Sequence, residues 1–143
     1  MIKYEISHFI HTIHREQVII YKKYNKYYVI DNDVYILRSL INYKNCYKGG
    51  RKVIFIDNNY LNYVLKKLRD GNIGYVIINI NYGYDRLLDY KINNSKYSYY
   101  YKKGKRLIKN EKKVKHVIDI LNRTKNLELL KEVDSIINEE GFC

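Results

Sequence analysis

The chain has 143 residues and a mass of 17.4 kDa, with 27 basic and 15 acidic side chains and a formal net charge of +12. This length suits one domain, and a hydrophobic content of 46% supplies a core, which excludes a wholly disordered chain. Apolar runs are only a few residues long and the two cysteines lack metal-ligand spacing. We therefore expect a soluble, cytoplasmic protein with no secretion signal, membrane span, metal or other cofactor.

The amino-acid composition is strongly biased. The chain contains 21 Ile, 20 Lys, 18 Tyr and 16 Asn, which together are 75 of the 143 residues. All four have AT-rich codons, so the composition indicates an AT-rich genome and weakens any binding argument drawn from lysine content alone. The positive charge still favours polyanionic partners electrostatically.

The first predicted element is a short amphipathic helix, in which His8, His11 and His14 lie three residues apart. We interpret these histidines as a partly exposed polar stripe, because no nearby Cys or Asp joins them at the spacing of a zinc site. The apolar residues that predict the helix are Ile2, Ile6, Phe9, Ile10 and Ile13.

Two β-prone runs follow, at residues 18–21 and 27–30, and they predict a hairpin that turns near Asn25 and Lys26. Residues 31–33, Asp-Asn-Asp, then offer N-cap oxygens to a helix. The apolar face of that helix is formed by Val34, Leu37, Leu40 and Ile41.

A strand is predicted over residues 52–56, and the Asp-Asn-Asn sequence at 57–59 predicts the cap of a second helix. Gly71 is expected to close that helix in a left-handed C-cap, before a strand over residues 74–80. Residues 1–84 thus predict an α/β fold, a mixed β-sheet flanked by helices, with some parallel neighbours among its strands.

Residues 85–143 predict a basic segment and two C-terminal helices packed on the same domain. Between Lys91 and His116 there are ten Lys or Arg residues and one acid. Apolar spacing predicts helices over residues 107–121 and 127–137, and the end of the chain is acidic.

Sequence motifs favour a protein that is not an enzyme, because no glycine-rich phosphate loop or nucleophile elbow is present. The best catalytic candidates are Asp31, Asp33 and Asp57, which follow predicted strands. Carboxylates at neighbouring strand ends can hold Mg²⁺ for phosphodiester cleavage. A helix-capping role explains each of them without a metal, so we predict no catalytic residue and no metal site.

The segment at residues 97–106 combines tyrosines with Lys102, Lys103, Lys105 and Arg106. Such basic side chains neutralise phosphates, and tyrosine rings stack on bases. The alternative interpretation is a solvated loop and first helical turn in a protein with AT-biased codons, and we give the two equal weight.

Residues 14–22 and 25–33, together with 60–68 and 71–76, resemble the N-terminal mismatch-recognition domain of MutS proteins in order and spacing. The resemblance extends over residues 4–80 and is closest to small stand-alone MutS-like proteins. It implies a mixed-sheet α/β fold that binds DNA.

In that family a phenylalanine wedge and a glutamate read the mispaired base. The resemblance assigns the wedge position to Tyr27, the glutamate position to Val29 and the hairpin tip to Lys26. Adjacent strand residues face opposite sides, so we expect either Tyr27 or Tyr28 to be exposed and able to stack on a base.

We therefore predict a non-enzymatic DNA-binding module that contacts mainly the backbone of double-stranded or distorted DNA. Two alternatives remain open: a protein-interaction module that forms a homodimer through the C-terminal helices, and a divalent-metal nuclease. The predicted DNA-binding residues are Lys26, Tyr27, Tyr28, Arg51, Lys52, Lys102, Lys103, Lys105 and Arg106.

Overall fold

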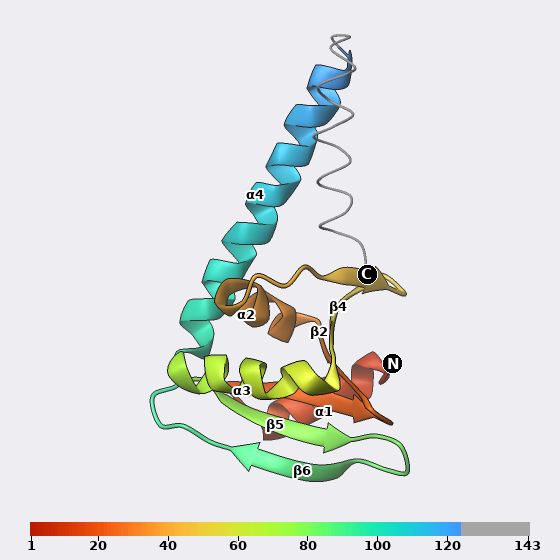
Figure 1. Ribbon diagram of the computed structural model, residues 1–143, viewed down its shortest axis with the longest axis vertical. Helices are drawn as coiled ribbons and strands as arrows, with labels where there is room; N and C mark the ends of the chain where they lie inside the picture. The colour runs from red at the N-terminus through yellow and green to blue at the C-terminus, as the bar shows by residue number, and fades with distance from the viewer. Residues whose placement is uncertain (124–143) are drawn as a thin grey trace.

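Six strands form one mixed sheet in the computed structural model, which describes residues 1–123 (Figure 1). β1 and β5 are parallel and every other neighbouring pair is antiparallel. The fold is therefore α/β with a mixed sheet, as the sequence predicts. In spatial order the strands are β3 (Cys46–Lys48), β4 (Arg51–Ile56), β2 (Lys26–Ile30), β1 (Gln17–Lys23), β5 (Gly74–Asn79) and β6 (Asp85–Tyr90).

Helices cover both faces of the sheet. On one face, α2 (Asn32–Leu40) and α3 (Leu61–Asp70) pack over strand residues such as Val29 and Ile54. A single 3₁₀ turn, η1 (Asn58–Tyr60), leads into α3. On the other face, α1 (Tyr4–Ile13) packs over Ile19 and Val76. Because successive strand residues point to opposite faces, almost every residue of β1 and β2 is buried.

The last described element is α4 (Tyr97–Arg123), which packs along α2 and then extends away from the sheet (Figure 1). Gly104 permits the close approach, because a Cβ there would overlap the carbonyl oxygen of Tyr35. The Tyr35 and Tyr101 rings meet edge to face at 5.3 Å, and Arg38 forms an ion pair with Glu111. These contacts with α2 fix where α4 leaves the domain.

Local patterns predict most elements correctly. The helix α1, the hairpin, α2, α3 and strands β4 and β5 are confirmed. The hairpin turns at Tyr24 and Asn25, one residue before the predicted turn. The left-handed cap at Gly71 is wrong: Gly71 has a φ of −80°, and the next residue, Asn72, has a φ of 58°.

Two features after residue 80 differ from the sequence interpretation. β6 was not predicted; it lies beyond residue 84 and pairs with β5, so the sheet continues past that boundary. The tyrosine-rich segment from Tyr97 is the start of α4, so the helical turn of the alternative interpretation is confirmed and the loop is wrong. The helix predicted at residues 127–137 lies outside the described residues. Among residues 1–123, no helix is both long and apolar enough to cross a lipid bilayer.

Candidate nucleic-acid interface

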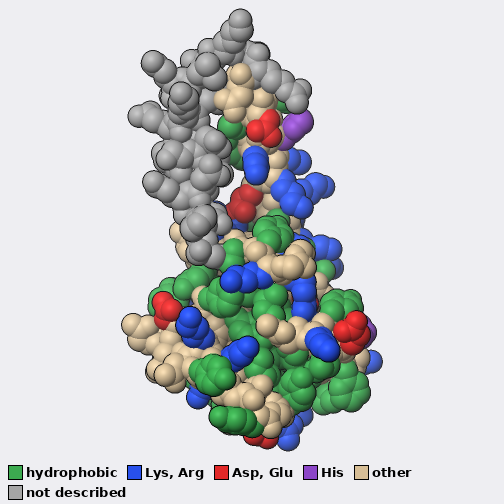
Figure 2. Space-filling view, turned by 90° about the vertical axis from the view of Figure 1, so that its right-hand side faces the viewer, with side chains coloured by type: hydrophobic (Ala, Val, Ile, Leu, Met, Phe, Trp, Pro, Cys, Tyr) green, Lys and Arg blue, Asp and Glu red, His purple; other side chains and the backbone are tan. Residues whose placement is uncertain are grey.

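Basic side chains form a stripe along α4. At 3.6 residues per turn, seven of them fall within an arc of roughly 120° around the helix axis. All seven are exposed, whereas Gly104 and Ile108 on another side of α4 are buried. Figure 2 shows Lys and Arg side chains gathered along this helix. The residues of the stripe, here called the α4 arc, are Lys102, Lys105, Arg106, Lys109, Lys112, Lys113 and His116.

Of the four cations predicted to bind DNA in residues 97–106, helical geometry places three on the α4 arc and one outside it. Lys102, Lys105 and Arg106 belong to the α4 arc, but Lys103 lies roughly 60° beyond its edge. Three further cations of the α4 arc, Lys109, Lys112 and Lys113, are not among the predicted DNA-binding residues. Their spacing of three and four residues from one another and from the predicted cations is the signal that would have found them.

Lys52 of β4 extends the α4 arc through a chain of cation–ring and ring–ring contacts. Its Nζ lies 5.1 Å from the ring centroid of Tyr35, which meets Tyr101 edge to face. The Nζ of Lys105 lies 5.1 Å from the ring of Tyr101. A hydrogen bond to Tyr35 raises the pKa of Lys52 against the opposing effect of partial burial, so its ammonium stays charged. The fold thus brings Lys52 and Lys105 onto one surface.

Arg51 lies on the other face of the sheet, because it neighbours Lys52 in the strand. Its guanidinium is 2.6 Å from Asp31 Oδ2 and donates to the carbonyl of Ile2 at 2.6 Å. It also donates to the hydroxyl of Ser7 at 3.2 Å. The hydrogen bonds that Arg51 donates to the Asp31 carboxylate raise the pKa of Arg51. Arg51 therefore ties the start of α1 to the sheet and does not lie beside the α4 arc.

Neither Tyr27 nor Tyr28 is exposed, so the expectation that one of these two reaches the surface is wrong. Tyr27 is 8% exposed and packs in the core beneath α2 and α3. Tyr28 is 3% exposed on the α1 side, where its hydroxyl accepts a hydrogen bond from the backbone amide of Ile2. The two side chains do face opposite ways, but helices cover both faces of the sheet.

Lys26 is exposed at the hairpin tip, away from the α4 arc. Just before α4, the hydroxyl of Ser95 donates to the carbonyl of Glu16, which precedes β1. The hairpin tip lies at the opposite end of β1, roughly 20 Å away at the rise of an extended strand. The structure therefore separates Lys26 from Lys102, Lys105 and Arg106.

The candidate catalytic carboxylates do not converge. Because β2 and β4 are antiparallel, with Ile30 opposite Val53 and Tyr27 opposite Ile56, Asp31 and Asp57 lie at opposite ends of the strand pair. Neither side chain makes the predicted helix-capping hydrogen bond. Within residues 1–123, no group of three or more His, Cys, Asp or Glu side chains is placed to hold a metal ion.

Asp33 is instead the centre of a buried cluster that sequence patterns did not reveal. Its fully buried carboxylate accepts hydrogen bonds from the Ile19 amide at 3.0 Å, His11 Nε2 at 2.8 Å and the Tyr97 hydroxyl at 2.6 Å. Burial and the charge of Asp33 raise the pKa of Tyr97, so its hydroxyl remains a donor. Asp33 thereby anchors the first residue of α4 and positions the α4 arc.

His11 is a cation in this cluster. Its Nε2 faces the Asp33 carboxylate and its Nδ1 lies 2.8 Å from the carbonyl of Ser7, so both ring nitrogens donate to acceptors. Burial lowers the pKa of His11, but the hydrogen bond and charge of Asp33 outweigh it and raise the pKa to about 9. The predicted polar stripe is thus only partly correct, since His8 is exposed but His14 is buried against Gln17.

No protein-family model matches this chain, and neither does any curated protein sequence. The functional interpretation therefore depends on the geometry and charge of the chain itself.

Proposed function

We propose that this protein is a non-enzymatic DNA-binding module that contacts the backbone of double-stranded DNA through the α4 arc and Lys52. The observation that carries the proposal is the alignment of seven basic side chains on one exposed side of a helix that extends from the domain. Each Lys or Arg that neutralises a phosphate releases condensed counterions, which supplies affinity without reading the sequence.

The shape of the interface agrees with this function. A single α-helix is narrow enough to lie in or along the major groove of B-DNA, which is about 12 Å wide. Its docking on α2 through Gly104, and the anchoring of Tyr97 by Asp33, hold it in one orientation. Phosphate contacts from such a helix position a duplex but specify little sequence, so we expect modest sequence preference.

The proposal places DNA binding on α4 and not on the hairpin that resembles the MutS mismatch reader. Tyr27, at the wedge position of that resemblance, is buried in the core and cannot stack on a base without disrupting it. Val29, at the glutamate position, is fully buried as well. These two side chains therefore cannot make the protein bind distorted DNA more tightly than regular duplex DNA.

The first test is the affinity for a labelled duplex of arbitrary sequence, measured by fluorescence anisotropy across a salt series. With six Lys or Arg of the α4 arc and Lys52 engaged, log affinity should fall against log salt with a slope of about −6. Replacing Lys26→Glu at the hairpin tip should leave that slope unchanged. Absence of binding at low salt would contradict the proposal. The alternative, a protein-interaction module that forms a homodimer, would then be tested by measuring the oligomeric state with light scattering.

A further inference from the structure

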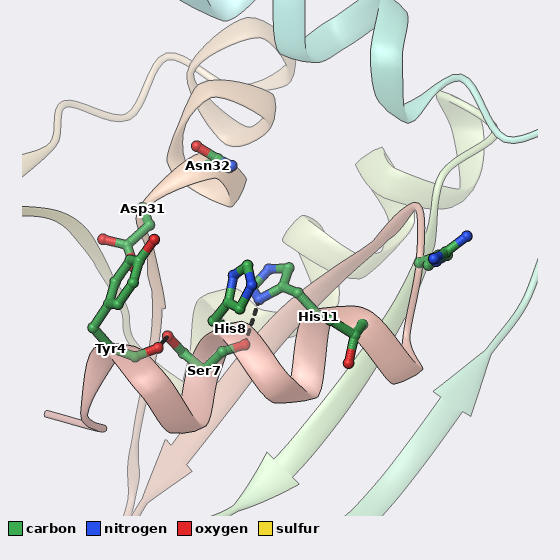
Figure 3. Close-up of a pocket in the computed structure, with 8 residues that line it drawn as sticks. Tyr4, Ser7, His8, His11, Asp31 and Asn32 are labelled. Carbon is green, nitrogen blue, oxygen red and sulfur yellow. Dashed lines mark hydrogen bonds between the residues drawn. The ribbon is translucent and has the colours of Figure 1, made fainter.

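A second polar surface lies away from the α4 arc, in a cleft of about 320 Å³ between α1 and the start of α2 (Figure 3). Its floor is formed by one face of α1 and by Arg15 in the turn that follows α1, and Asp31 and Asn32 form its other side. The α1 residues are spaced three and four apart, which places them on a common face. In Figure 3 the rings of His8 and His11 rise from α1 on the side that faces Asn32.

Three hydrogen-bond donors in this cleft are not used by the fold. His8, Arg15 and Asn32 are exposed, and within residues 1–123 none of their side chains makes a hydrogen bond or an ion pair. His8 makes only a ring contact, stacking on Tyr4 with a centroid distance of 6.0 Å. A guanidinium, an imidazole and a carboxamide are thus available together at one opening.

The acidic side chain that lines the cleft is already paired. Asp31 lines it, but both of its oxygens accept hydrogen bonds from Arg51, at 3.1 and 2.6 Å. Asp33 lies below and is paired with His11, whose two ring nitrogens are both engaged. The unpaired charge among the residues that line the cleft is therefore that of Arg15.

We propose that this cleft binds a phosphate group, held by Arg15, His8 and Asn32, with the Tyr4 ring beside the organic part of a phosphate ester. Arg offers two parallel donors that match two oxygens of a phosphate. The same group can come from a small phosphomonoester or from the 5′-phosphate of a nucleic-acid end.

The test uses inorganic phosphate and the histidine ring resonances of the full chain, followed by NMR at constant ionic strength. Phosphate should shift the His8 signals saturably, and Arg15→Ala should weaken binding about tenfold or more, because a charge-assisted pair is lost. Arg15→Lys should be intermediate, because it keeps the charge and loses the two-point contact. Lys3→Ala, at the N-cap position just before α1 and outside the residues that line the cleft, is the matched control.

A shift that grows linearly with phosphate, or an equal loss of affinity in Lys3→Ala, would overturn the proposal. The source of the phosphate is then distinguished with a short oligonucleotide carrying or lacking a 5′-phosphate. Preference for the phosphorylated end that disappears in Arg15→Ala assigns the cleft to nucleic-acid ends. Equal binding of the two oligonucleotides, with inorganic phosphate still saturable, assigns it to small phosphate esters.

Discussion

The side chain on which the architecture depends most is Asp33. Its carboxylate accepts hydrogen bonds from α1, β1 and α4, and it is fully buried at the start of α2. A buried carboxylate is costly unless it is paired and hydrogen-bonded, and here a histidine cation and two neutral donors satisfy it. One residue therefore couples four elements and sets the origin of α4.

Replacing Asp33→Asn should destabilise the protein by about 3–5 kcal/mol, because the His11 cation is then left without its partner. The free energy of unfolding in urea measures this effect. Asp57→Asn is the matched control, since Asp57 is exposed and should change stability by about 0.5 kcal/mol or less. Equal stability of the two variants would contradict the role given to Asp33.

The His11–Asp33 pair also predicts how stability depends on pH. The folded-state pKa of His11, about 9, lies above the unfolded value of 6.5, so the folded protein holds the proton more tightly. The stabilisation is complete below pH 6.5 and is lost as pH rises through 9. Each pKa unit corresponds to about 1.4 kcal/mol, so the full contribution is roughly 3 kcal/mol.

Unfolding free energies at pH 6.5 and 9.5 test this prediction when wild type is compared with His11→Gln, which cannot titrate. Wild type should lose roughly 3 kcal/mol more than the variant over this interval. Parallel losses in the two proteins would show that other groups carry the pH dependence.

At the scale of elements, the packing of α4 against α2 depends on one glycine, Gly104. Gly104→Ala would normally favour a helix by about 1 kcal/mol. Here the added Cβ overlaps the carbonyl oxygen of Tyr35, so we expect net destabilisation of about 1–3 kcal/mol and weaker docking on α2. Thermal unfolding and amide exchange along α4 measure both effects. Ser98→Ala, at an exposed position of the same helix, is the control and should not loosen α4.

The elements that sequence predicts are those defined by local patterns. The hairpin, α2 and α3 follow from apolar periodicity and polar turns, which need no knowledge of neighbouring elements. β6 has no such pattern, since its residues are mostly exposed and its strand conformation comes from pairing with β5. Tyr27 is buried because helices cover its face of the sheet, and Asp31 is separated from Asp57 because β2 and β4 run antiparallel. Both features depend on contacts between elements that are distant in the sequence.

At the scale of the whole molecule, the fold brings only some of the cations along the chain onto one surface. Lys52, Lys102, Lys105 and Arg106 were identified from the sequence and lie on one surface. Helical geometry excludes Lys103 from that surface. Lys26 and Arg51 are excluded by the tertiary arrangement of the sheet and α1, which the sequence alone does not specify.

The central claim is that position, and not total charge, determines DNA binding. Two triple variants separate these effects. The arc variant alters the α4 arc and carries Lys102→Glu, Lys105→Glu and Lys109→Glu. The control variant alters exposed lysines elsewhere and carries Lys23→Glu, Lys66→Glu and Lys103→Glu. Each lowers the formal net charge from +12 to +6.

The deciding measurement is the salt dependence of duplex affinity for these two variants and wild type. The arc variant should bind far more weakly than the control variant, with a salt slope shallower than wild type by about 3, because three phosphate contacts are lost. The control variant should keep the wild-type slope. Equal losses of affinity and slope in both variants would contradict an interface on α4.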